Sequence, residues 1–325
     1  MRKKRMTVKM NSGIVDVVKY SPENKIKWDR FVSKSKNGVF LFNRDYMEYH
    51  SDRFQDHSLL FFKNGELIGL LPANIRGDEL HSHEGLTFGG VITSIDMTAP
   101  LMLELFESFI NYCKRLNIRK IFYKTIPYIY HLVPSEEDLY ALFRYNATLK
   151  YRGVSSSVQN NGRVIKYYNY RKKNLQKAIK NGVIVKRSYD FGGFMKMLEE
   201  VLRQYHGIKP VHSAEEIILL ANRFPEYIKL FSAYKNDVML AGGIVYESEN
   251  VAHGQYGANS AEGRELGAED LVFDYLIKDY YKDKKYFDFG ISTEKFGQVL
   301  NSGLCTYKEA FGARTVVYDC YQIDL

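Results

Sequence analysis

The segment Tyr286–Ala313, YFDFGISTEKFGQVLNSGLCTYKEAFGA, holds two residues whose types suit catalysis, a carboxylate at Asp288 and an amine at Lys308. Asp288 opens an Asp-Phe-Gly tripeptide, which holds magnesium in protein kinases. A kinase also needs a glycine-rich nucleotide loop, a strand lysine in a V-A-I-K context and an H-R-D catalytic loop. None of these motifs occurs in the chain, so a kinase is excluded.

Lys308 lies in a helical pattern. Leu304, Tyr307, Lys308 and Phe311 follow one another at i, i+3, i+4 and i+7, and Gly312 is suited to end the helix. The pattern places the lysine on the stripe that is otherwise buried. A buried ammonium needs an anionic partner, whereas a lysine that only passes its apolar neighbours would extend to solvent. Both interpretations are open.

Asp288 lies in a strand pattern. Alternation places Phe287 and Phe289 on one face and Tyr286 and Asp288 on the other. Asp288 could orient or deprotonate an attacking amine, because amide formation on an activated acyl group needs little beyond positioning and a base. The alternative is a structural carboxylate that caps a loop.

Tyr256 could donate a proton or a hydrogen bond to a leaving group. The chain has 26 tyrosines, so packing in the core is the competing interpretation. In the stretch His81–Glu84, residues at i and i+2 of a strand share a face, so a pair such as His81 and His83 could be taken as metal ligands. No third ligand follows at a recognisable spacing, and we assign no metal. The three cysteines are scattered and are expected to be reduced thiols.

A basic helix is expected at Arg171–Val185, RKKNLQKAIKNGVIV, ending near Gly182. Its apolar stripe comprises Tyr168, Leu175, Ala178 and Ile179, and its basic residues are Arg171, Lys172, Lys173, Lys177 and Lys180. The run is either a solvated face or a phosphate clamp for coenzyme A, a nucleotide-linked acceptor or tRNA. Arg171 is nearest the stripe and is the candidate phosphate ligand.

The composition is that of a globular protein, with 45% hydrophobic and 26% charged residues among 325. This length suits two domains. No apolar run is long enough to span a membrane, and we expect a cytoplasmic protein. The formal charge of +8 suits an anionic small-molecule or nucleotide-linked partner, tRNA included, although base composition alone can produce it.

The same series of elements occurs twice. Apolar runs flank Asn64-Gly65 and again Asn236-Asp237, each typical of a hairpin. The later elements, in order, are an aromatic-glycine strand at 86–92 and 253–258, a helix at 101–113 and 271–280, and an aromatic strand at 119–125 and 284–290. The sequence therefore predicts two α/β modules, residues 1–150 and 151–325, joined by a turn-forming stretch at 149–162.

This order resembles that of the Gcn5-related (GNAT) acyltransferases, and a tandem pair resembles the FemABX peptidyltransferases and the BioF2-like acetyltransferases. Arg171–Val185 is similar to the family's basic helix, which ends K-A-x-K-x-G-V-x-V. Phe287–Gly290 and Gly303–Gly312 are similar to its Y-D-F-G and G-L-x-x-F-K-x-x-F-G motifs. The resemblance implies mixed α/β sheets in two tandem GNAT-like domains, with Asp-Phe-Gly at the end of a central strand.

The resemblance also implies an N-acyltransferase or aminoacyltransferase. An amine would attack the activated acyl group directly, with Asp288 as base or orienter, Lys308 stabilising negative charge and Arg171 holding phosphate. The donor would be acyl-CoA or aminoacyl-tRNA. Arg264 and Gly267 match the superfamily's (Q/R)-x-x-G-x-(G/A) pyrophosphate loop, but Glu269 stands where a small residue belongs.

In the first module, Phe40–His50 is similar to the family's F-L-Q-S-x-x-W segment. His50 stands where peptidoglycan-type members carry an acceptor-binding lysine, and Arg44 or Arg53 could serve instead. The expected acceptor is an amine of a cell-envelope or polysaccharide precursor. The competing hypotheses are a binding protein that keeps the double fold without catalysis, and a nucleic-acid-binding protein, for which no recognition helix is present.

Overall fold

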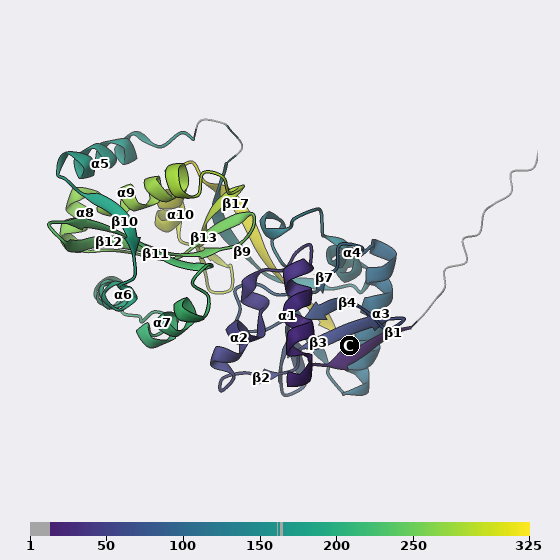
Figure 1. Cartoon of the computed structure of the whole chain (residues 1–325). Coiled ribbons are helices and arrows are strands. Elements are labelled where there is room, and N and C mark those ends of the chain that lie inside the picture. Colours follow the sequence, from purple (N-terminus) through teal and green to yellow (C-terminus); the bar gives the residue numbers. More distant parts are fainter. Residues whose placement is uncertain (1–13, 161, 163–164) are drawn as a thin grey trace, which may run out of the picture.

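The computed structural model describes residues 14–160, 162 and 165–325 (Figure 1). We call residues 14–147 the N-terminal module and residues 165–313 the C-terminal module. Two long strands run between them, β9 (Thr148–Gln159) and β17 (Arg314–Asp324). In the described part of the chain no helix is both long and apolar enough to cross a membrane.

The N-terminal module contains a four-stranded antiparallel sheet in the order β1-β3-β4-β7. Its strands are β1 (Val15–Lys19), β3 (Leu59–Lys63), β4 (Glu66–Leu71) and β7 (Ile92–Thr93). Strand alternation divides its side chains between two cores. Leu60 packs in the cluster that contains Trp28 of α1 (Lys25–Lys34), whereas Leu59 packs in the cluster that contains Phe106 of α3 (Ala99–Arg115). The module also contains the short helices α2 (Arg44–Met47) and α4 (Glu137–Arg144).

The second sheet has eleven strands in the order β10-β11-β12-β13-β14-β9-β17-β8-β6-β5-β2. The strands not yet given are β10 (Ile184–Ser188), β11 (Ile228–Lys235), β12 (Val238–Glu247), β13 (Val251–Asn259), β14 (Tyr286–Ile291), β8 (Lys120–Lys124), β6 (Glu79–His81), β5 (Asn74–Arg76) and β2 (Gln55–Asp56). The pairs β13–β14 and β6–β8 are parallel, and the other pairings in this sheet are antiparallel.

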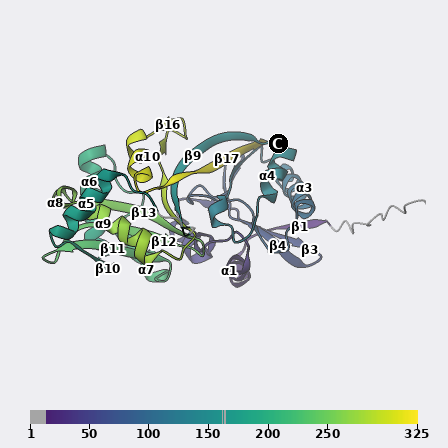
Figure 2. The ribbon, with the colours of Figure 1, turned by 90° about the horizontal axis from the view of Figure 1, so that it is seen from above.

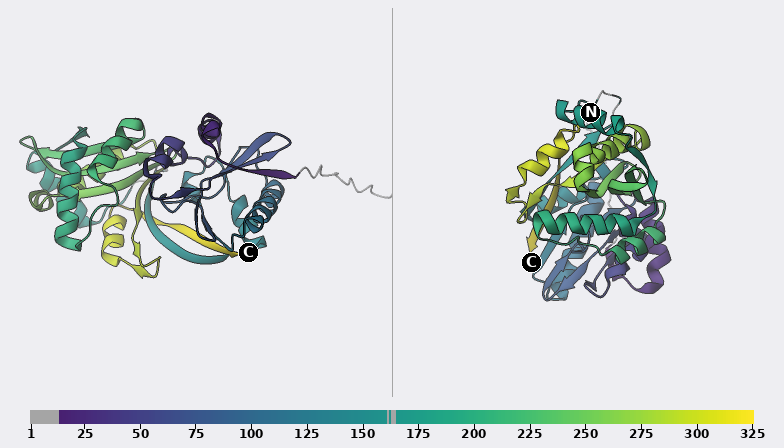
Figure 3. Two further views of the ribbon diagram at one scale, coloured as in Figure 1. Left: turned by 90° about the horizontal axis from the view of Figure 1, so that it is seen from below. Right: turned by 90° about the vertical axis from the view of Figure 1, so that its left-hand side faces the viewer.

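Strands β9 and β17 make this sheet continuous through both modules. They curve side by side between the modules in Figures 2 and 3. β9 also pairs with β14, and β17 also pairs with β8. The boundary predicted at residue 150 therefore lies just inside β9.

The expectation of a turn-forming stretch at 149–162 was wrong, because β9 occupies most of it. Ser155, Ser156 and Ser157 are buried in the middle of the strand. The local preference of serine for turns is overridden by pairing on both sides, with β14 and with β17.

Helices cover both faces of the sheet in the C-terminal module. These are α5 (Asn169–Lys180), α6 (Phe191–His206), α7 (Ala214–Arg223), α8 (Ala261–Leu266), α9 (Ala268–Tyr275) and α10 (Ser302–Glu309). Figure 1 shows α6 and α7 on one side of the strands and α5 and α9 on the other. The helix expected at 271–280 is α9 followed by a π-helical turn, Leu276–Tyr280.

The two predicted hairpins are confirmed as β3–β4 and β11–β12. The predicted aromatic-glycine strand is confirmed in the second copy as β13, but the first copy is a strand only at Ile92–Thr93. Gly90 explains the difference, because its φ of +90° breaks the extended backbone, and a Cβ there would lie 3.0 Å from the carbonyl oxygen of Lys124.

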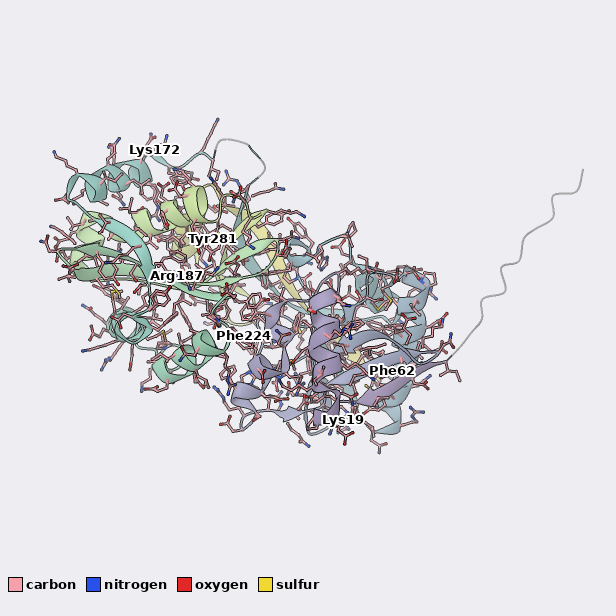
Figure 4. All side chains as sticks on the ribbon, viewed as in Figure 1. Lys19, Phe62, Lys172, Arg187, Phe224 and Tyr281 are labelled. Atoms are coloured by element: carbon pink, nitrogen blue, oxygen red, sulfur yellow. The ribbon has the colours of Figure 1, made fainter. Side chains whose placement is uncertain are left out.

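Aromatic side chains fill the contact between the modules. Phe224, which follows α7, lies between α7 and the N-terminal module in Figure 4. Its ring centroid is 5.6 Å from that of Phe40 and 5.9 Å from that of Tyr46. One hydrophobic cluster therefore includes residues of both modules.

Candidate active site

Asp288 lies on β14 and is completely buried. Its Oδ1 accepts hydrogen bonds from the hydroxyls of Ser155 at 2.6 Å and Ser157 at 2.5 Å. Its Oδ2 accepts from Tyr318 at 2.8 Å and lies 2.8 Å from Nδ1 of His253. Burial raises the pKa of the Asp288 carboxyl, but the hydrogen bonds, led by that from His253, outweigh it and hold the pKa below its usual value.

His253 connects this buried carboxylate to a cavity. The parallel register of β13 and β14 places His253 directly opposite Asp288. His253 lines this cavity. Because Nδ1 of its ring faces Asp288, Nε2 is the ring nitrogen that can interact with a molecule bound in the cavity. A carboxylate that holds Nδ1–H fixes the tautomer in which Nε2 accepts a proton, and this is the arrangement of a general base.

This cavity, which we call the cleft, has a volume of about 460 Å³. It is bounded by β13, the end of β14, the start of α9 and helix α10, and its lining includes His253, Tyr256, Glu269, Gly290, Tyr307 and Lys308. The sequence motifs at 253–258, 287–290 and 303–312 therefore meet at one place.

Lys308 is 6% exposed, as its place on the apolar stripe of α10 predicts. Its ammonium donates hydrogen bonds to the carbonyl oxygens of Gly290 and Ile291, both at 2.8 Å. Among the described residues no carboxylate lies within ion-pair distance of it. Burial lowers the pKa of the Lys308 amine to about 8, although the nearby Asp288 carboxylate acts in the opposite sense.

Gly290 permits the close approach of these groups. Its φ of +76° is in the left-handed region, and a Cβ there would lie 3.2 Å from Cε1 of His253. The glycine of the Asp-Phe-Gly tripeptide thus ends the strand beside the histidine ring and presents its carbonyl oxygen to Lys308.

Tyr256 also lines the cleft, on β13. Its hydroxyl lies 2.6 Å from Nδ1 of His212, and burial raises its pKa above the usual value. The same burial lowers the pKa of His212 to about 4, so that His212 is neutral near neutral pH. Tyr256 is thus a protonated hydroxyl beside a neutral imidazole.

The junction of α8 and α9 contains the residues of the predicted pyrophosphate loop, Arg264, Gly267 and Glu269. Gly267 has a φ of +75°, and a Cβ there would lie 2.7 Å from the carbonyl oxygen of Asn174 on α5. Arg264 is exposed and lies over the ring of Tyr205, outside the cleft lining. Glu269 faces the cleft, and burial raises the pKa of its carboxyl.

Arg171 of α5 is buried beside this junction. Its Nη1 donates to Oδ1 of Asp270 at 2.6 Å and its Nη2 to the carbonyl oxygen of Tyr307 at 3.0 Å. The guanidinium also lies 4.0 Å from the ring centroid of Tyr307. The structure therefore uses Arg171 to tie α5 to α9 and α10, and it does not line the cleft.

Two of the three proposed acceptor residues, His50 and Arg53, lie at a second cavity of about 330 Å³, which we call the inter-module cavity. His50 is buried in its wall, with its ring 5.3 Å from that of His83 and with no hydrogen bond to either ring nitrogen among the described residues. Arg53 lies at its edge and pairs with Glu216 of α7. Thr87, Val211 and Gln255 line both this cavity and the cleft.

Arg44 is a structural residue in this arrangement. It is buried, lies 3.7 Å from the ring centroid of Tyr20, and pairs with Glu48 and Asp56, both at 3.0 Å. It does not line the inter-module cavity.

His81 and His83, which the sequence suggested as possible metal ligands, have different neighbours in the structure. The ring of His81 stacks on Phe122, whereas the ring of His83 stacks on His50.

Sequence reasoning missed His253 and the serines that hold Asp288. His253 belongs to the strand pattern at 253–258, but only the parallel register with β14 places it opposite Asp288. Ser155 and Ser157 alternate along a strand, and this period of two is the one local signal that could have identified their shared face.

The sequence matches no protein-family model and no curated protein. Solved structures match its fold. The crystal structure of FemX has a TM-score of 0.67 at 13% identity and covers 95% of this chain and 97% of its own. L-PGS from Bacillus licheniformis has a TM-score of 0.58 at 12% identity, with 94% and 92% covered.

A tandem GNAT protein from the clavulanic acid biosynthesis pathway has a TM-score of 0.51 at 9% identity, with 95% of this chain and 98% of its own covered. These similarities extend over nearly the whole chain and confirm the architecture expected from the motifs. The protein therefore has the tandem GNAT fold, which it shares with FemX and with the tandem GNAT protein.

Proposed function

We propose that this protein transfers an activated acyl or aminoacyl group to an amine in the cleft of the C-terminal module. The observation that carries the proposal is the Asp288–His253 pair, whose histidine lines a cavity that Lys308 also lines. A base and a positive charge at one cavity are what amide formation from an ester or thioester needs.

The proposed reaction uses each group once. Nε2 of His253 takes a proton from the attacking amine while Asp288 holds Nδ1–H and balances the positive ring. The amine nitrogen bonds to the acyl carbon, and the Lys308 ammonium stabilises the negative oxygen that forms. The bond to the leaving oxygen or sulfur then breaks, and the leaving group takes a proton, for which Tyr256 is the candidate donor.

The start of α9 favours aminoacyl-tRNA over acyl-CoA as donor. In acyl-CoA users of this superfamily a helix start cradles the pyrophosphate. Here Glu269 places a carboxylate in the cleft at that helix start, and the Arg171–Asp270 pair and the backbone of Asn174 cover its other side. A carboxylate beside a pyrophosphate is unfavourable.

The inter-module cavity is the proposed acceptor site. It adjoins the cleft, with which it shares the lining residues Thr87, Val211 and Gln255, and its lining includes Arg53 and His50. An arginine suits an anionic acceptor. The resemblance to the FemABX family favours an amine on a cell-envelope or polysaccharide precursor.

The test is a transfer assay with purified protein, bulk tRNA charged with labelled amino acids, acetyl-CoA as the second donor, and extracted envelope precursors as acceptors. We expect label to move from tRNA to an acceptor. His253→Gln should lower the rate by about 10²- to 10⁴-fold, the usual contribution of general base catalysis. Lys114→Ala, at an exposed position on α3 that lines neither cavity, is the control and should leave the rate unchanged.

Two results would count against the proposal. Full activity of a folded His253→Gln variant would remove the histidine from the mechanism. Binding of charged tRNA or of an acceptor without any transfer from either donor would favour a protein that keeps the double fold only to bind.

A further inference from the structure

A third cavity, also of about 460 Å³, lies where the N-terminal module meets β9, β17 and Phe296 of the C-terminal module, and it shares no lining residue with the cleft. We propose that this lateral cavity binds a nucleotide, an aromatic heterocycle that carries phosphate. Its lining comes from β5, β6, β8, β9, β17 and the small hairpin of β15 (Thr293–Glu294) and β16 (Val299–Leu300), and includes His81, Phe122, Lys124, Lys150, Tyr151 and Phe296.

Aromatic rings supply the surface for a heterocycle. Phe122 and His81 are stacked across the parallel β6–β8 pair, with ring centroids 4.7 Å apart and planes at 12°. Phe296 is 81% exposed, and its ring centroid lies 6.1 Å from that of Tyr151. Exposed rings at a cavity are the means by which proteins stack nucleobases.

The hairpin holds Phe296 at this place in an unfavourable backbone conformation. Phe296 has a φ of +53° and Lys295 a φ of +47°, a region that bulky residues rarely adopt. Gly297 fixes the hairpin against β9, because a Cβ there would lie 2.2 Å from the carbonyl oxygen of Arg152. Backbone strain that keeps an aromatic ring exposed points to a ligand that covers the ring.

Lysines supply the charge for a phosphate. The Lys124 ammonium is partly buried and donates to the carbonyl oxygens of Leu86 and, at 3.5 Å, Glu84. Lys150 is exposed at the rim. Among the described residues neither lysine has a carboxylate within ion-pair distance. Glu84, the carboxylate that also lines this cavity, is paired with Arg76, which pairs with Glu79 as well. A partly buried ammonium that lacks a counter-charge favours an anionic ligand.

The strand arrangement explains why this cavity binds rather than catalyses. The series β6–β8–β17, a parallel pair followed by an antiparallel strand, repeats the series β13–β14–β9 around the cleft. In the cleft His253 is paired in register with Asp288, and in the lateral cavity His81 is paired in register with Phe122. A ring therefore stands where the cleft has the carboxylate that orients its histidine.

A nucleotide matches this combination because it joins a flat ring to a phosphate, and the volume is in the range of small-ligand sites. The test is calorimetric titration of the full-length protein with the common ribonucleoside 5′-monophosphates, their nucleosides and inorganic phosphate. We expect at least one monophosphate to bind, and its nucleoside and phosphate to bind at least about tenfold more weakly, because each lacks one of the two recognised groups.

Variants at exposed positions locate the binding without disturbing the core. Phe296→Ala and Lys150→Ala should each weaken binding about fivefold or more. The matched controls are Phe143→Ala, at an exposed aromatic residue on α4, and Lys114→Ala, at an exposed lysine on α3, and neither should have an effect. His253→Ala in the cleft should also have no effect.

The proposal is overturned if no monophosphate binds, if binding is unchanged in both Phe296→Ala and Lys150→Ala, or if it is lost in His253→Ala, which would place the nucleotide in the cleft. None of these outcomes depends on acyl transfer, so a failure of the proposed reaction is recognised separately.

Discussion

At the scale of single residues, the site depends on the carboxylate of Asp288, whose two oxygens each accept two hydrogen bonds. An ionised carboxylate only accepts hydrogen bonds, and Asp288 receives one from each of Ser155, Ser157, Tyr318 and His253. These hydrogen bonds offset the free-energy cost of removing the carboxylate from water, and the one with His253 fixes the orientation of the histidine ring.

Asp288→Asn tests this arrangement. The amide keeps the size of the side chain but turns an N–H donor toward groups that already donate. We expect the free energy of unfolding in urea to fall by about 1–3 kcal/mol, the usual cost of an unsatisfied buried group, and transfer to be lost. Ser157→Ala removes one donor and should retain most of the activity. A folded Asp288→Asn variant with full activity would contradict the role of the carboxylate.

Lys308 predicts a particular pH dependence. The pKa of its amine is about 8 in the folded protein, below the usual 10.5. Between these values the unfolded chain binds more protons than the folded one, so this group's contribution to stability rises with pH across that window and is lost as pH falls through about 8. If the ammonium form acts in catalysis, transfer should instead decline above about pH 8.

The measurement compares the wild type with Lys308→Met by denaturant unfolding between pH 7 and 10.5 and by rates over the same range. The variant should show a smaller rise in stability with pH. The pKa of Lys124 is also lowered to about 8 by burial, so Lys124→Met should show a similar loss of slope without moving the alkaline limit of the rate. An unchanged slope in Lys308→Met would show that its amine titrates normally.

The sequence identified some site residues and not others for a physical reason. The burial of Lys308 follows from helical spacing within one segment, which is local information. The partnership of His253 with Asp288 depends on the register between two parallel strands that a helix separates in the chain. That register is set by tertiary packing, and no short segment contains it.

At the scale of elements, the hairpin turns were predictable because their backbone demands are local. Asn236 and Asp237 have φ values of 47° and 61°, and Asn64 and Gly65 have 52° and 79°. Positive φ at both central residues is the type I′ geometry that suits strand twist. The strand expected at 86–92 does not form over most of this range, because the backbone turns at Gly90, which packs closely against Lys124 of β8. This is a contact between segments that are distant in the sequence.

These two turns provide a matched pair of substitutions. Asp237→Gly relieves a side chain in the left-handed region and should raise the free energy of unfolding by about 0.5–1 kcal/mol. Gly65→Asp, where no atom lies within 4 Å of the added Cβ, should lower it by a similar amount. Urea denaturation measures both. A decrease for Asp237→Gly would show that the aspartate side chain contributes more than its backbone strain costs.

At the scale of the whole molecule, the repeat predicts two modules, but the hydrogen bonds join them. β9 and β17 carry one sheet through both, and Phe224 of one module packs on Phe40 of the other. The chain's C-terminal strand lies against β8 of the N-terminal module, where Ile323 is buried in its core. The pattern of the repeat contains no information on this connection, because the pattern is local to each copy whereas β17 pairs with strands distant in the sequence.

This connection predicts that both modules unfold together, and the chain provides a local probe of the question. Its single tryptophan, Trp28, is buried in α1 of the N-terminal module, so its fluorescence reports on that module, whereas far-UV circular dichroism reports on both. Leu276→Ala, in the remote core of the C-terminal module, should destabilise the protein by about 2–5 kcal/mol.

If both modules unfold in a single cooperative transition, the unfolding midpoint measured by Trp28 fluorescence must shift together with the midpoint measured by circular dichroism. The control Leu105→Ala, in the N-terminal core, should shift both midpoints as well. In Leu276→Ala the unfolding midpoint measured by Trp28 fluorescence could instead stay at the wild-type value. That result would mean that β9 and β17 do not couple the two modules, and that the N-terminal module is stable when the C-terminal module is unfolded.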